Sequence, residues 1–113
     1  VQGSLVFFNI DYVRDRIRWI VSRLPRSTRW FVLDAEAVTT IDSTAVAVLA
    51  EIKDELLQRN VRLGLANLHA QPRELLARSG LLASIGPQML FTHLEDAALA
   101  FSPLPPECCH ILR

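Results

Sequence analysis

The stretch from Trp30 to Ala45 reads WFVLDAEAVTTIDSTA and combines a strand signal, a loop and the start of a helix. Its first four residues form a continuous apolar run of strand length, which predicts a strand buried on both faces. From about residue 44 to residue 59, apolar side chains recur at helical spacing. They are Ala45, Val48, Leu49, Ile52 and Leu56. The stretch therefore predicts one strand–loop–helix unit of an α/β domain.

The segments on either side continue this alternation. Short β-type runs at residues 5–10, 61–66 and 89–91 predict three more strands. Helical patterns follow them, with Asp11 as the expected cap of the first helix and Thr92 and Glu95 as the expected capping box of the last. Strands that alternate with helices indicate an α/β fold with a largely parallel sheet.

The same patterns set the expected extent of the domain. Residues 1–102 contain every predicted element, whereas residues 103–113 hold three prolines and little pattern. We therefore expect one domain over residues 1–102 and a flexible tail over 103–113. The chain begins Val1-Gln2-Gly3 without an initiator methionine, so we expect a domain excised from a longer protein.

Composition excludes several classes of protein. Half of the 113 residues are hydrophobic, which is too many for a disordered chain. Twelve basic residues balance twelve acidic ones, whereas a nucleic-acid-binding domain usually carries a basic excess. Cys108 and Cys109 are the two cysteines, and adjacent cysteines cannot staple a fold, so we expect a reduced, cytoplasmic-type domain.

Charge is balanced only over the whole chain. Residues 1–29 carry six arginines against two aspartates, whereas residues 34–55 carry six acidic residues against Lys53 alone. Two interpretations stay open: two solvated helix faces, or a basic face that meets an anionic partner or a membrane surface. Trp19 and Trp30 lie among the arginines, but their positions favour packing in the core over stacking on nucleic acid.

The candidate site is the helix start at Asp42, Ser43, Thr44 and Ala45. Free N–H groups and the positive end of the helix dipole favour an anion there, and a phosphate added to either hydroxyl would lie beside them. The alternative is that Asp42 or Ser43 is simply the N-cap of the helix.

Other chemistry has weaker support. Ser43, Asp42 and His69 or His93 include the residue types of a hydrolase triad, but the Gly-x-Ser-x-Gly motif is absent. The sequence also contains no glycine-rich phosphate loop, and Cys108, Cys109 and His110 are too close in sequence to close a tetrahedral metal site easily. We expect no enzyme activity and no metal.

Several segments in order resemble one family. The run Ile41-Asp42-Ser43-Thr44-Ala45, after the apolar strand, resembles the signature of the STAS domain. This domain is shared by anti-sigma factor antagonists and by the cytoplasmic C-terminal ends of SulP-type anion transporters. Three segments of the sequence are more similar to the transporter branch than to the antagonists. They are Phe7-Phe8-Asn9 with residues 12–17, residues 30–42, and residues 63–67 with 75–81.

The resemblance implies a mixed, mostly parallel sheet of four to five strands with about four flanking helices. It implies a regulatory domain without catalytic activity that modulates transport, folding or assembly of a transporter of sulfate or a related anion such as bicarbonate. Implied partners are the transmembrane domain of the same polypeptide, a second copy in a homodimer and other cytoplasmic proteins, but not nucleic acid. The implied location is the cytoplasmic face of the membrane, no cofactor is required, and nucleotide binding stays open. The alternative is a free-standing anti-sigma factor antagonist switched by phosphorylation at Ser43 or Thr44.

Overall fold

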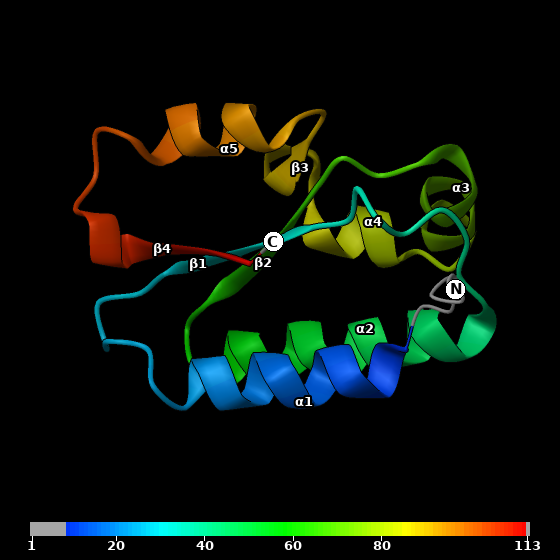
Figure 1. Ribbon diagram of the computed structural model, residues 1–113, viewed down its shortest axis with the longest axis horizontal. Helices are drawn as coiled ribbons and strands as arrows, with labels where there is room; N and C mark the ends of the chain where they lie inside the picture. Colours follow the sequence, from blue (N-terminus) through cyan, green and yellow to red (C-terminus); the bar gives the residue numbers. More distant parts are fainter. Residues whose placement is uncertain (1–8, 113) are drawn as a thin grey trace, which may run out of the picture.

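The computed structural model describes residues 9–112, and its centre is a four-stranded sheet of order β3-β2-β1-β4 (Figure 1). Every neighbouring pair of these strands is parallel, so the predicted α/β fold with a largely parallel sheet is confirmed. The strands are β1 (Trp30–Asp34), β2 (Arg62–Ala66), β3 (Leu90–Phe91) and β4 (Cys109–Leu112). The helices are α1 (Ile10–Val21), α2 (Ser43–Gln58), α3 (Ala70–Arg78), α4 (Leu81–Ile85) and α5 (Leu94–Phe101).

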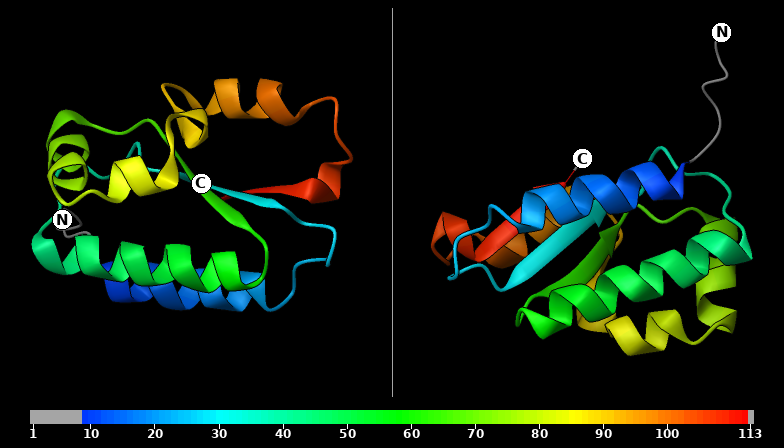
Figure 2. Two further views of the ribbon diagram at one scale, coloured as in Figure 1. Left: turned by 180° about the vertical axis from the view of Figure 1, so that it is seen from behind. Right: turned by 90° about the horizontal axis from the view of Figure 1, so that it is seen from below.

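The two faces of the sheet are covered unequally. Helices α1 and α2 lie side by side on one face, and α5 crosses the other (Figures 1 and 2). Side chains alternate along β1, so Phe31 joins the larger core under α1 and α2, whereas Val32 joins a smaller cluster with Ala97 of α5. Both residues are fully buried, as expected for a central strand of a parallel sheet.

Local signals explain the ends of α2. The predicted helix over residues 44–59 is found over Ser43–Gln58. Asn60, which the sequence places at the C-terminal end, adopts a left-handed conformation with φ of 61°. The Val61 N–H then donates to the Leu56 carbonyl oxygen at 2.9 Å, which satisfies one of the free carbonyls in the last turn.

Two predicted caps are wrong by one or two positions. Asn9, not Asp11, caps α1, because its backbone is extended and its side chain accepts a hydrogen bond from the Tyr12 N–H at 3.1 Å. Asp11 lies in the first turn, where its charge favours the positive end of the helix dipole. At α5 the N-cap is His93, whose N–H donates to the Asp96 carboxylate at 3.2 Å.

The C-terminal segment also differs from the expectation of a flexible tail over residues 103–113. Residues 109–112 form β4, which pairs in parallel with β1, and Leu112 is buried. Thr28 holds the approach to this strand, because its buried hydroxyl donates to the Glu107 carbonyl oxygen at 2.7 Å. Residues 109–112 are ordered because their backbone pairs with the distant strand β1, which the proline-rich local sequence does not predict.

Two further predictions concern the N-terminal part of the chain. The strand predicted over residues 5–10 falls mostly outside the described residues, and its last residue, Ile10, is the first residue of α1. The prediction that Trp19 packs in the core is wrong, since its side chain is 57% exposed. Trp30 does pack against the core and contacts Phe101 with ring centroids 5.0 Å apart.

The position of His110 on β4 predicts a pH dependence of stability. Its ring stacks on Phe31 with centroids 5.2 Å apart, and burial lowers the pKa of His110 below its ordinary value of 6.5. The unfolded chain therefore takes up this proton more readily, so the free energy of unfolding is expected to fall as the pH drops below about 6.5. Urea unfolding at about pH 7.5 and about pH 5.5 measures the effect.

A control variant compares His110 with a histidine at an exposed position. His110→Gln should flatten the dependence over this pH range, whereas His93→Gln, at an exposed position, should leave it in place. An equal pH dependence in wild type and His110→Gln would show that another group is responsible.

Candidate functional site at the carboxyl ends of the strands

The loop between β1 and α2 is held at its start by residues that follow β2. The Asp34 carboxylate accepts hydrogen bonds from the Asn67 side-chain amide and from the Glu36 N–H, each at 3.0 Å. The His69 ring nitrogen Nε2 lies 2.6 Å from the Glu36 carbonyl oxygen. The carboxyl ends of two adjacent parallel strands thus fix the course of the loop.

Gln71 holds the other end of the loop. Its side-chain oxygen accepts from the Ile41 N–H at 2.8 Å, and its side-chain nitrogen donates to the Ile41 carbonyl oxygen at 3.0 Å. This pair of hydrogen bonds fixes the backbone immediately before α2. The first turn of α2 is therefore positioned by α3, in which Gln71 lies.

All four candidate residues lie at this first turn, as the sequence predicts. The Asp42 carboxylate accepts from the Ala45 N–H at 2.9 Å, so the N-cap interpretation of Asp42 is confirmed. Ser43 and Thr44 are exposed, whereas the Ala45 side chain is 2% exposed and packs into the core. A small residue at position 45 lets the helix start lie close to the sheet.

The N-cap hydrogen bond of Asp42 affects the two interpretations of the site, as a place for an anion or as a simple helix cap. Because a carboxylate already occupies the N-cap, an anion at the same helix end would meet its negative charge. The hydroxyls of Ser43 and Thr44 are on the surface and open to a modifying enzyme. Phosphorylation of either residue and nucleotide binding beside them stay predictions from the sequence.

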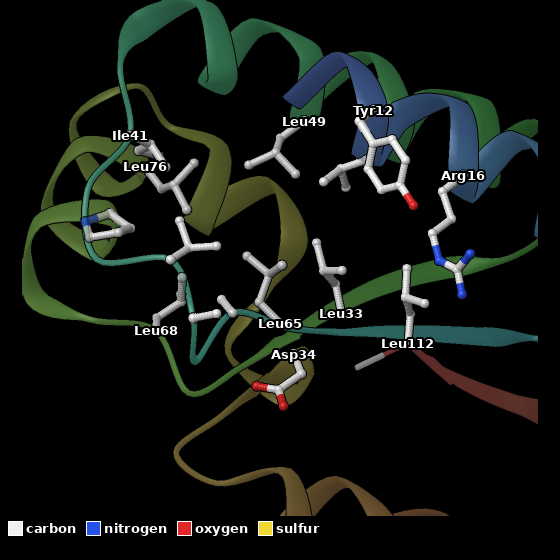
Figure 3. Close-up of a pocket in the computed structure, with 15 residues that line it drawn as sticks. Tyr12, Arg16, Leu33, Asp34, Ile41, Leu49, Leu65, Leu68, Leu76 and Leu112 are labelled. Carbon is white, nitrogen blue, oxygen red and sulfur yellow. The ribbon is translucent and has the colours of Figure 1, made fainter. Parts of the chain in front are cut away.

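An apolar cavity of about 400 Å³ lies beside the loop (Figure 3). It is bounded by the ends of β1, β2 and β4 and by side chains of α1, α2 and α3. Tyr12 and Arg16 reach it from α1, whereas the Asp34 carboxylate points away from its centre. None of the four candidate residues lines it. The unusual apolar content of the loop, with Ala35, Ala37, Val38 and Ile41, is the sequence signal that could have indicated it.

Among the described residues, no hydrogen bonds link the side chains named as a possible hydrolase triad. His69 is engaged by the Glu36 carbonyl, and no hydrogen bond within residues 9–112 joins Ser43 to a histidine. Burial, with the neighbouring Cys108 as a smaller cause, raises the pKa of Cys109 to about 11, so this thiol stays protonated at neutral pH. Along β4, Cys109 and His110 point to opposite faces of the sheet.

Comparisons with known proteins show the family to which the chain belongs. A family model described as "STAS domain" matches residues 1–97. The chain belongs to the STAS domain family. The "Probable sulfate transporter Rv1739c" of Mycobacterium tuberculosis is 35% identical over 100 residues, which are 88% of this chain and 18% of the relative. The "Probable sulfate transporter 3.5" of Arabidopsis thaliana is 36% identical over 100 residues, 87% of this chain and 16% of that protein.

Solved structures agree with the STAS fold. A sulfate transporter family protein from Wolinella succinogenes superposes with a TM-score of 0.67 at 26% identity, over 80% of this chain and 74% of the other. The SulP transporter STAS domain from Vibrio cholerae superposes with a TM-score of 0.71 at 15% identity, over 81% and 73% of the two chains. At that identity the second likeness shows the fold alone.

The chain matches only a small part of its relatives, and the described helices are not of the membrane-spanning kind. The chain spans about one-sixth of the length of the curated relatives named above. Among the helices of residues 9–112, none combines the length and the apolar character needed to cross a bilayer.

Proposed function

We propose that the chain is a regulatory, non-catalytic STAS domain of a SulP-type transporter of sulfate or a related anion such as bicarbonate. One observation carries the proposal. Relatives named as sulfate transporters match 87–88% of this chain at 35–36% identity, yet the match takes up only 16–18% of their own length. In this proposal the domain works joined to a transmembrane part, at the cytoplasmic face of the membrane.

The structure supports an interaction role over a chemical one. The loop at the carboxyl ends of the strands is fixed by hydrogen bonds to the side chains of Asn67, His69 and Gln71. A rigid surface of this kind suits docking, because little conformational entropy is lost on binding. The proposed partners are the transmembrane part of the same polypeptide, a second copy of the domain and other cytoplasmic proteins. The relatives found favour the transporter branch over a free-standing antagonist.

The first test asks in what form the domain occurs in its cells. Cells are separated into membrane and soluble pools and immunoblotted with an antibody raised against this chain. We expect a band several-fold larger than 12.7 kDa in the membrane pool, because the relatives are much longer than the chain. A small band confined to the soluble pool would contradict the proposal and would favour the phosphorylation switch.

The second test measures the regulatory role itself. Sulfate and bicarbonate uptake are compared for the intact reading frame and for one that lacks the segment encoding residues 9–112, each normalised to the amount of protein in the membrane. We expect uptake per transporter to change on deletion. Unchanged uptake per transporter, with unchanged membrane levels, would show that the domain neither regulates transport nor assists assembly.

A further inference from the structure

One exposed stripe of α1 alternates aromatic and basic side chains. Tyr12, Arg16, Trp19 and Arg23 follow one another at spacings of four, three and four residues, which places them along one side of α1 and of the turn that follows it. Tyr12 is 63% exposed and Trp19 is 57% exposed, and Tyr12 and Arg16 also line the open edge of the cavity beside the loop. We call these four residues the α1 stripe.

The orientation of the α1 stripe is fixed by the opposite side of the helix. Ile17 and Ile20 are buried against α2 and the sheet, so α1 cannot rotate to hide Trp19 without exposing them. The Arg23 guanidinium lies over the Trp19 ring at 4.1 Å from its centroid, which holds the ring at the surface. The exposed aromatic rings therefore belong to the folded state.

The basic groups of α1 fall into two sets. Arg18 is committed to α2 through its guanidinium, which donates to both Glu55 oxygens, at 2.6 and 3.0 Å. This pair lowers the pKa of Glu55 and raises that of Arg18. Arg16 and Arg23, by contrast, have no carboxylate within 4.0 Å among residues 9–112.

Acidic side chains next to the α1 stripe are partly neutralised. Asp11 and Asp15 are exposed beside it, and Arg14 lies 3.5 Å from each of their carboxylates. The basic charge of the first helix thus divides into an ion pair between Arg18 and Glu55 and two arginines, Arg16 and Arg23, without a carboxylate partner in the described part of the chain.

From these observations we propose that the α1 stripe docks on an anionic membrane surface. Tyrosine and tryptophan combine an apolar ring with a polar tip, which suits the boundary between headgroups and acyl chains, and interleaved arginines suit lipid phosphates. A stripe of four side chains is small for a specific protein interface, which buries about 800 Å² on each partner. The inference does not depend on the proposed transport role, because it concerns the surface of this chain alone.

The test uses the 113-residue chain and lipid vesicles. Co-sedimentation is measured with vesicles of phosphatidylcholine alone and with about one-third phosphatidylglycerol, at about 0.1 M salt. We expect binding that needs the anionic lipid and weakens at higher salt. Arg16→Gln with Arg23→Gln should lower the partition coefficient about 25-fold, since each basic residue at the surface contributes about fivefold.

A second readout locates the contact. Quenching of tryptophan fluorescence by nitroxide-labelled lipid should be strong in wild type and lost in Trp19→Ala, which retains only Trp30. Matched controls are Arg73→Gln and Leu99→Ala, exposed positions on α3 and α5, which should bind as wild type does. The proposal is overturned by absence of binding to anionic vesicles, by binding that ignores charge, or by equal losses in the control variants.

Discussion

Phe31→Ala is expected to lower the free energy of unfolding by about 3–5 kcal/mol, the range for truncation of a buried phenylalanine. Phe31 is fully buried in β1, the strand that pairs with both β2 and β4. Its ring also stacks on His110 of β4, so truncation opens a cavity where α1, α2 and the sheet meet. Domains of this kind are stable by about 5–15 kcal/mol, so the variant is expected to be close to unfolding.

Urea unfolding followed by circular dichroism measures this effect, with two variants for comparison. Phe31→Leu keeps most of the apolar volume and should lose clearly less stability. Leu99→Ala removes a side chain that is 71% exposed and should change stability by less than about 0.5 kcal/mol. A similar loss in Phe31→Ala and Leu99→Ala would contradict the assigned centre of the core.

Gly64→Val is expected to destabilise the fold by about 1–3 kcal/mol or more, although valine favours strands. A Cβ at Gly64 would lie 2.9 Å from Met89 Cε and 3.0 Å from the Met89 carbonyl oxygen. The methyl group can move aside, but the carbonyl belongs to the turn that leads into β3 and cannot. The added side chain must therefore push β3 away from β2.

Gly80 provides the contrasting control. It lies after α3 with φ of 85°, and nothing lies within 4 Å of a Cβ added there. Gly80→Ala should cost about 1–2 kcal/mol through backbone strain alone, and Gly80→Asn should recover part of it, because asparagine tolerates this conformation. Thermal unfolding of wild type and of the three variants checks the pattern. If Gly64→Val were as stable as wild type, the close approach of β2 and Met89 would be wrong.

The elements with strong local signals could be predicted from the sequence. The apolar run Trp30–Leu33 and the helical spacing after Thr44 identify β1 and α2 to within a residue. The run is continuous because β1 is buried on both faces of the sheet, and the helical spacing arises because α2 buries one side against the larger core. Strand β4 could not be predicted in this way. Its residues are ordered by a partner strand about 80 positions away, and three prolines before it suggest a tail.

In the candidate site, too, the local contacts could be predicted from the sequence and the contacts between distant residues could not. Asp42 is recognised as a cap because capping is a local hydrogen bond, within three residues. The hydrogen bonds of Asn67, His69 and Gln71 to the loop cross about 30 positions of sequence and depend on how β1 and β2 pair. The burial of Trp19 is predicted wrongly for a related reason. Its position near the apolar side of α1 does not show whether the ring faces the core or the solvent.

The pairing of β4 with β1 also sets an order of events during synthesis. Trp30 pairs with Cys109, so this edge of the sheet can close only after residues 109–112 have left the ribosome. Until then β1, β2 and the helix α2 between them can form from nearer contacts, while the backbone groups of β1 on the β4 side have no strand partner there. A nascent chain that stalls late would therefore expose the central strand of the sheet to pairing with other chains.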